Sequence, residues 1–175
     1  METHHNAMDK RWIWIGLVAV IATVALVVIT TATFTPEGTE PAFNVATTFV
    51  NAAAQGDEAT AFPLLSPQLQ EWATTNCPNG RVSDCVQAYT PTEWGQLASA
   101  EFRRSTRVGA AWDIDLIGYY DQQGTQGFSG VCVYTRVEEA APGDWRVAGW
   151  AGWAWCGDPA TRNMARNPDA PNRVP

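Results

Sequence analysis

The most strongly patterned part of the chain is an uncharged apolar run near its start. From Trp12 to Thr31 the sequence reads WIWIGLVAVIATVALVVITT, without Asp, Glu, Lys or Arg. A helix rises about 1.5 Å per residue, so about twenty residues cover roughly 30 Å, the hydrocarbon thickness of a bilayer. We therefore expect residues 12–34 to form one transmembrane helix embedded in the lipid bilayer. A long buried helix and a cleaved secretory signal are the alternatives.

The charges that flank this run set the expected orientation. Lys10 and Arg11 directly precede it, and the next cation along the chain is Arg81. Cationic residues near a span tend to stay on the cytoplasmic side of the membrane. We therefore expect a cytoplasmic tail at residues 1–11 and an extracytoplasmic C-terminal part, held at the cell (plasma or inner) membrane by a single pass.

Helical spacing of apolar residues follows a short polar linker at residues 35–41. Between Ala42 and Gln55, one helical stripe is formed by Ala42, Val45, Ala46, Phe49, Val50 and Ala53. Asp57 can cap a second helix, and Ser66 followed by Pro67 is a start signal for a third. The first half of the C-terminal part is therefore expected to be helical.

The period then changes from helical to alternating, which is typical of strands with one buried face. In the segment from Trp112 to Leu116, Trp112, Ile114 and Leu116 share one side, and Asp113 and Asp115 take the other. Alternation of the same kind is present at residues 101–108, 131–137 and 145–155. Helices followed by strands predict the α+β class, with short helices packed on a four-stranded or larger, mainly antiparallel sheet.

The composition excludes several kinds of site. With 11 Lys plus Arg against 18 Asp plus Glu, the net charge is -7 at pH 7. Such a chain is repelled by a phosphate backbone, so we expect no nucleic-acid partner. His4 and His5, the two histidines, both precede the apolar run. No residue after the run can therefore use an imidazole as an acid, a base or a metal ligand, and we expect no metal and no cofactor.

Four cysteines follow the apolar run, on its expected extracytoplasmic side, where disulfides form. Cys77, Cys85, Cys132 and Cys156 are spaced by 8, 47 and 24 residues, which lacks the close pairs of structural zinc sites. Three pairings are possible. We favour Cys77 with Cys85, across a Pro-Asn-Gly turn, which leaves Cys132 with Cys156. A regular hairpin places Cys132 opposite Gly152, so this second disulfide requires a bulge that shifts the register.

One stretch resembles a known family. The sequence AFNVATTFVNAAAQGDEATAFPLLSPQL, from Ala42 to Leu69, resembles the opening of exported, membrane-anchored nuclear transport factor 2-like domains of bacteria. The resemblance implies such a domain over residues 42–157, with a curved sheet wrapped around its helices into a cone that holds an apolar pocket. Some members of the family are isomerases or dehydratases, and many membrane-tethered members serve as binding or assembly modules.

Tryptophans and carboxylates supply the candidate chemistry. Exposed aromatic side chains could bind a sugar, a peptide or an apolar ligand, and the candidates are Trp112, Trp150, Trp153, Trp155 and Tyr134. The alternative is that the tryptophans fill the core; alternation places Trp153 and Trp155 on one sheet face and Trp150 on the other. Acid–base chemistry would use Asp113, Asp115, Tyr119, Tyr120 and Asp121, but the first two face solvent if the Trp112 side is the packed one.

The sequence therefore predicts a single-pass, membrane-anchored extracytoplasmic module that binds a ligand or assembles with an envelope protein complex, without catalysis. The alternative is a small isomerase or dehydratase-like enzyme that uses the Asp and Tyr residues. Arg103, Arg104 and Arg107 are expected on a solvated strand face. Residues 158–175, rich in Pro, Asn and Arg, are expected to form a disordered tail.

Overall fold

The computed structural model describes residues 20–23, 40–121 and 130–175, and the chain divides into two units, Met1–Glu37 and Gly38–Pro175. In the first unit only residues 20–23 are described, and they are helical. None of the described helices has the length and apolar character needed to cross a membrane. The tail at 1–11, the linker up to residue 39 and most of the span at 12–34 lie outside the described residues.

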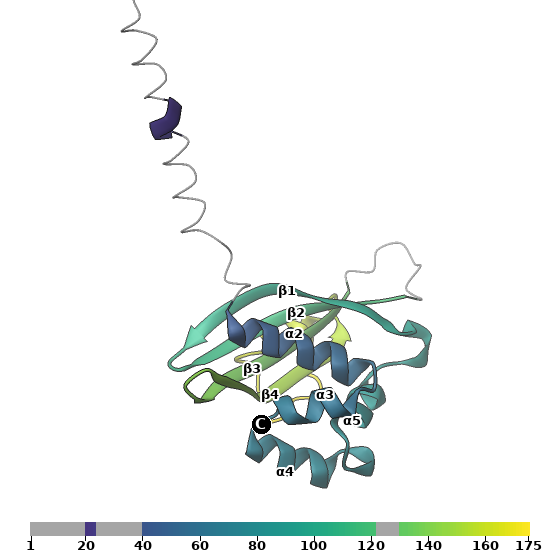
Figure 1. The fold of residues 1–175 in the computed structure, drawn as a ribbon. Coiled ribbons are helices and arrows are strands. Elements are labelled where there is room, and N and C mark those ends of the chain that lie inside the picture. Colours follow the sequence, from purple (N-terminus) through teal and green to yellow (C-terminus); the bar gives the residue numbers. More distant parts are fainter. Residues whose placement is uncertain (1–19, 24–39, 122–129) are drawn as a thin grey trace, which may run out of the picture. The chain divides into compact units, whose positions relative to one another are not determined.

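The second unit begins with four α-helices and short 3-10 turns (Figure 1). The elements before the sheet are α2 Pro41–Ala54, α3 Glu58–Ala61, η2 Phe62–Leu64, α4 Pro67–Asn76, η3 Pro78–Gly80, α5 Val82–Tyr89 and η4 Thr92–Trp94. Both predicted caps are confirmed, because the Asp57 carboxylate accepts from the Thr60 amide at 3.1 Å and the Ser66 hydroxyl accepts from the Leu69 amide at 3.3 Å. Helix α5 was not expected from the sequence.

The four strands form one antiparallel meander in the order β1-β2-β3-β4. The strands are β1 Leu97–Val108, β2 Ala111–Tyr120, β3 Val131–Ala141 and β4 Asp144–Trp155. The predicted α+β class and four-stranded antiparallel sheet are therefore confirmed. Along β2, Ile114 and Leu116 are buried against the helices, as the alternating pattern requires.

Two bulges in β4 overturn the predicted faces of its tryptophans. The β3–β4 register shifts by one residue at Ala148 and again at Trp153. Gly152 has a φ of 104° and Trp153 a φ of 47°, which turns the Trp153 side chain to the helix side, together with Trp150. The expectation that these two indoles lie on opposite faces is wrong, because it assumed an uninterrupted period of two.

The same shifts make the second disulfide possible. Cys132 pairs with Ala154 instead of Gly152, so Cys156 comes close enough to bond with it, with their Cα atoms 4.9 Å apart. The Cα atoms of Cys77 and Cys85 are 5.0 Å apart and also form a disulfide. Both favoured pairings are confirmed, and the required bulge is present.

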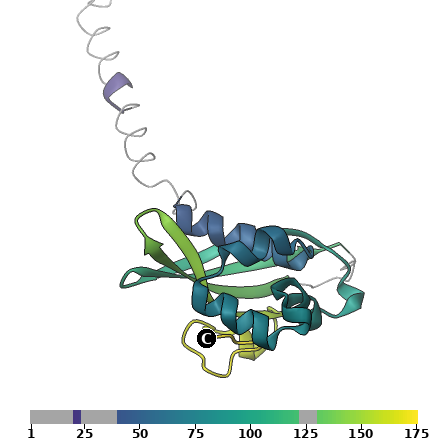
Figure 2. The same cartoon turned by 60° about the horizontal axis from the view of Figure 1, so that its bottom comes forward.

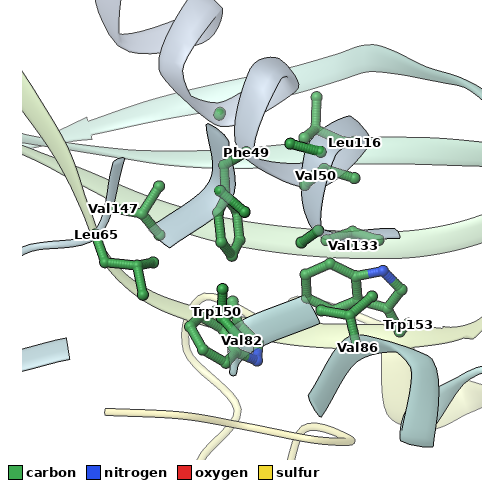
Figure 3. Close-up of a cluster of buried hydrophobic side chains, with 14 of the residues drawn as sticks. Phe49, Val50, Leu65, Val82, Val86, Leu116, Val133, Val147, Trp150 and Trp153 are labelled. Atoms are coloured by element: carbon green, nitrogen blue, oxygen red, sulfur yellow. The ribbon is translucent and has the colours of Figure 1, made fainter. Parts of the chain in front are cut away.

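The helices cover one face of the sheet and bury the main core between them. Phe49 and Val50 of α2 and Val82 and Val86 of α5 meet sheet residues such as Val133 in this core (Figure 3). The other face is covered by the C-terminal segment, residues 158–175, as Figure 2 shows from below.

The expectation of a disordered tail is wrong. Met164 and Ala170 are buried against Tyr134 and Ala151, and the Val174 amide donates to the Trp150 carbonyl at 2.8 Å along the edge of β4. The segment is poor in large apolar residues, but the few that it has lie against the sheet and its backbone finds hydrogen-bond partners there. The composition of the segment alone predicted neither these apolar contacts nor these backbone hydrogen bonds.

Candidate functional site

Two of the predicted ligand-binding tryptophans belong to the core. Trp150 and Trp153 are 0% and 1% exposed. The Phe49 ring lies 5.6 Å from Trp150 and 6.2 Å from Trp153, and Trp72 packs edge-on against Trp150 at 5.8 Å. Side chains therefore fill the space between the sheet and α2 where these indoles lie (Figure 3).

The other three predicted ligand-binding residues lie in separate places. Trp112 packs 5.4 Å from Phe43, with the Arg107 guanidinium 5.6 Å from its ring. Trp155 is 49% exposed at the end of β4, and Tyr134 is buried on the opposite sheet face beneath the C-terminal segment. The structure therefore does not bring the five predicted residues together into one site.

The carboxylates of β2 lie on the face opposite Ile114 and Leu116, as predicted, but the expectation that they face solvent is wrong. The side chains of Asp113 and Asp115 are only 10% and 12% exposed. Asp113 accepts from the Tyr134 hydroxyl at 2.7 Å and from Arg136 at 3.4 Å, and Asp115 is paired with Arg104. These partners hold both carboxylates in a hydrogen-bonded network, which is a structural role.

The remaining members of the predicted acid–base set are divided between the two sheet faces. Tyr120 belongs to the core on the helix side, whereas Tyr119 is 40% exposed. The Asp121 carboxylate accepts from the Gln96 amide at 2.9 Å, and the Asp121 amide donates to the Gln96 carbonyl at 3.0 Å. Asp121 therefore joins the end of β2 to the loop that precedes β1. Asp113 and Asp115 lie on the sheet face opposite Tyr120.

A pocket opens where α2 ends, α5 ends and β2 ends. Its volume is about 470 Å³, within the range of small-molecule sites. It is lined by Ala54, Gln55, Gln87, Thr90, Pro91, Thr92, Gly95, Gln96 and Tyr120. None of these residues carries a charge, and most end in an amide or a hydroxyl.

The polar side chains that line this pocket differ in burial and in partners. The Tyr120 hydroxyl is buried and makes no hydrogen bond within the described part of the chain. Gln55, Gln87 and Gln96 are exposed, so water can satisfy their side-chain amides. Thr90 differs, because its hydroxyl donates to the Val86 carbonyl at 3.0 Å. A buried polar group without a partner is costly, and the Tyr120 hydroxyl carries that cost inside the core with no surface open to the pocket.

Burial also fixes the protonation state of Tyr120. Desolvation raises the pKa of its phenol well above the ordinary value of 10, because the low-dielectric surroundings disfavour the phenolate. The neighbouring ring of Trp94 lies 5.6 Å from the Tyr120 ring and contributes to that burial. At neutral pH the hydroxyl is therefore a neutral hydrogen-bond donor.

A smaller cavity lies on the other face, between β1, β2 and the C-terminal segment. Its volume is about 140 Å³, and its lining includes Arg104, Asp113, Asp115, Asn163 and Arg166. Two arginines and two aspartates balance one another there, and both aspartates already have partners. In the described residues, no group of three or more His, Cys, Asp or Glu side chains could hold a metal ion.

Sequence reasoning identified Tyr120 for a different chemistry and missed the glutamines altogether. Gln55 and Gln87 are 32 residues apart, and no periodic pattern or motif relates them. Comparison of the chain with protein-family models, curated proteins and solved structures finds no match in any of the three. The assignment of this pocket as a candidate site therefore rests on its geometry alone.

Proposed function

We propose that this chain is a membrane-anchored extracytoplasmic binding module without catalytic activity, and that the pocket at the end of α2, α5 and β2 is its binding site. The observation that carries the proposal is a pocket of about 470 Å³ whose lining residues are uncharged and include Gln55, Gln87 and Gln96. Such a surface offers many hydrogen bonds and no group suited to proton abstraction.

The anchored, extracytoplasmic part of the proposal rests on the sequence. The uncharged run of residues 12–34 is long enough for one span, and Lys10 and Arg11 favour a cytoplasmic N-terminus. Two disulfides join all four cysteines, which suits an oxidising compartment. The resemblance to nuclear transport factor 2-like domains supports a module that binds a ligand or joins an envelope complex.

The positions of the carboxylates favour a binding function over a catalytic one. An isomerase or dehydratase of this kind requires a carboxylate or an imidazole beside its ligand, and the nine residues that line the pocket include neither. Asp113 and Asp115 are bonded to arginines and to Tyr134 on the opposite face of the sheet.

The position of the pocket also suits a tethered receptor. The chain enters the domain at the start of α2, near Pro41, whereas Ala54 and Gln55 line the pocket at its other end (Figure 1). A helix of 14 residues is about 20 Å long. The pocket is thus separated from the start of α2 by the length of that helix.

A fragment screen on the full chain in lipid nanodiscs tests the binding site without assuming a ligand. Thr92 is exposed and lines the pocket, so Thr92→Trp fills it without disturbing the core. Thr75→Trp, at an exposed position on α4, is the matched control. We expect ligand-observed NMR to find fragments whose binding is abolished by Thr92→Trp and kept by Thr75→Trp. A hit set unaffected by Thr92→Trp would refute the assigned site.

A further inference from the structure

The sheet has two outer edges, and the described part of the chain covers them unequally. At the outer edge of β4, Leu65 and Val174 form isolated bridges with Val147 and Trp150. Strand β1 lies at the opposite edge of the sheet (Figure 1). Among the described residues, neither a strand nor an isolated bridge pairs with its outer side. A long strand at an open edge is a template for pairing with another chain.

We propose that the outer edge of β1 binds an acidic, extended segment of another protein, which adds to the sheet as a further strand. Main-chain hydrogen bonds along the edge supply affinity in this mode of recognition, and the places for alternate side chains supply specificity. The edge is separate from the pocket at the end of α2, α5 and β2, so this proposal does not depend on that binding site.

The end of β1 next to the β1–β2 hairpin has regular strand pairing. After the register shift at Arg103, residues 104–108 pair one for one with β2, a length close to that of an average strand. Phe102 and Val108, at the two ends of this stretch, are 36% and 43% exposed. The Phe102 ring lies on the helix side, 5.0 Å from the ring of Phe43. An added strand therefore finds an uninterrupted edge with exposed apolar surface at both ends.

Charge is divided unequally between the helices and this side of the sheet. Residues 40–96 carry one arginine and six acidic residues. Strand β1 and the C-terminal segment together carry only three acidic residues but six arginines, which are Arg103, Arg104, Arg107, Arg162, Arg166 and Arg173. An acidic segment is therefore repelled by the helical layer and attracted to the side of β1.

The cavity of about 140 Å³ beside β1 offers a place for one acidic side chain. Arg104 of β1 and Arg166 of the C-terminal segment both line it. Arg104 is paired with Asp115. The other aspartate of the lining, Asp113, is paired with Arg136. Arg166 forms no ion pair within the described part of the chain. A carboxylate that enters the cavity beside Arg166 therefore gains a partner that arginine is well suited to provide.

Two other occupants fit these features less well. Each copy of β1 carries three arginines and one acidic residue, Glu101. A second copy paired through its own β1 would gather these arginines along one seam, where like charges on neighbouring strands are destabilising. Anionic lipid headgroups would satisfy the arginines but would leave the main-chain groups of the edge without a strand to pair with.

Fluorescence anisotropy with short labelled peptides, on the full chain in nanodiscs of neutral lipid, tests the proposal. The probe alternates Glu and Val. A second peptide alternates Lys and Val, and a third is the Glu–Val probe with N-methyl groups on its central amides. We expect the probe to bind at least about tenfold more tightly than either control, because one lacks the complementary charge and the other lacks the main-chain donors. Equal binding of either control would overturn the proposal.

Hydrogen exchange and matched variants locate the binding. The bound probe should slow amide exchange in β1 and leave α4 unchanged. Arg166→Glu should weaken binding about tenfold. Arg81→Glu makes the same change of charge at an exposed position among the helices, and it should leave binding unchanged. Urea midpoints establish that both variants fold. Protection confined to the helices, or equal effects of the two variants, would contradict the assigned edge.

Further measurements test the other occupants and separate the two proposals. A dimer of the native chain that the probe dissociates, seen by sedimentation in detergent, would assign the edge to a second copy and overturn the proposal. Displacement of the probe by phosphatidylglycerol vesicles, but not by phosphatidylcholine vesicles, would assign the arginines to lipid and overturn it as well. Thr92→Trp, which fills the pocket at the end of α2, should leave probe binding unchanged. Failure of the probe to bind would therefore refute the edge and leave the pocket proposal intact.

Discussion

The Tyr134 hydroxyl donates to Oδ1 of Asp113 across 2.7 Å, beneath the C-terminal segment on the face of the sheet away from the helices. Arg136 approaches the same carboxylate oxygen at 3.4 Å. The pair therefore joins β3 to β2 in a largely buried place, where a lost partner is costly.

We expect Tyr134→Phe to lower the free energy of unfolding by about 1–3 kcal/mol, because Asp113 stays buried after it loses a donor. Urea denaturation measures the change. Tyr119→Phe, at an exposed tyrosine of β2, should stay within about 0.5 kcal/mol of the native chain. If Asp113→Asn and Tyr134→Phe prove additive in a double-mutant cycle, the hydrogen bond does not contribute in the manner described.

Stability should fall at alkaline pH because two buried tyrosines resist ionisation. Burial raises the pKa of both Tyr120 and Tyr134, and the hydrogen bond to Asp113 adds to the effect at Tyr134. In the unfolded chain a tyrosine ionises near pH 10. Their stabilising contribution is therefore complete below about pH 10 and is lost progressively above it, by up to about 1.4 kcal/mol per pH unit for each group.

Urea midpoints measured from pH 8 to pH 11.5 check this expectation. In Tyr120→Phe the decline above pH 10 should be shallower, because one of the tyrosines with a raised pKa is gone, while Tyr134 and the half-buried Tyr89 remain. A native chain whose midpoint stays constant up to pH 11.5 would show that the phenols are not protected by burial.

The buried tryptophans should dominate the stability of the core. Trp153→Ala removes a side chain that is 1% exposed and packs against Phe49, and we expect a loss of about 3–5 kcal/mol. Trp155→Ala, only two residues away on the same strand, removes a side chain that is half exposed. It should therefore lower the free energy of unfolding far less than Trp153→Ala does. Chemical denaturation of the two variants distinguishes them, and similar losses would contradict the β4 bulge that sends Trp153 inward.

Local sequence patterns predicted much of the fold, but they did not predict the two bulges in β4. Alternation around Ile114 identified β2 and its faces, and the cap residues Asp57 and Ser66 marked two helix starts correctly. Two extra residues in β4 then moved Trp153 to the side of Trp150. A bulge is decided by tertiary packing and by the disulfide that it permits, so the strand sequence alone does not locate it.

Less of the candidate site than of the fold could be predicted from the sequence. Asp113 and Asp115 were correctly placed on the face away from Ile114, yet the segment that covers this face was expected to be disordered. The pocket joins Gln55, Gln87, Gln96 and Tyr120 from a helix end, a second helix, a loop and a strand end. Glutamine is common on surfaces, and only the folded arrangement shows that these residues line one pocket.

The C-terminal segment should resist protease as a packed element does. Arg162 and Arg166 lie within it, and Met164 between them is 2% exposed. We therefore expect trypsin to cleave the native chain slowly after these two arginines, and Met164→Ala to accelerate the cleavage at least tenfold by loosening the segment. Val108→Ala, at an exposed position of β1, is the control and should leave the rate unchanged. Immediate cleavage of the native chain would mean that the segment is not packed.

The predicted membrane anchor can be tested by adding charge to it. Each arginine at the centre of a span costs about 2.5–3.5 kcal/mol of insertion free energy. Val20→Arg together with Val24→Arg should therefore move the full chain from the membrane fraction, where we expect carbonate extraction to retain the native protein, to the soluble fraction. Val20→Leu with Val24→Leu keeps the apolar character and should stay in the membrane. Extraction of the native chain by carbonate would contradict a transmembrane anchor, because only a peripheral or released protein behaves in that way.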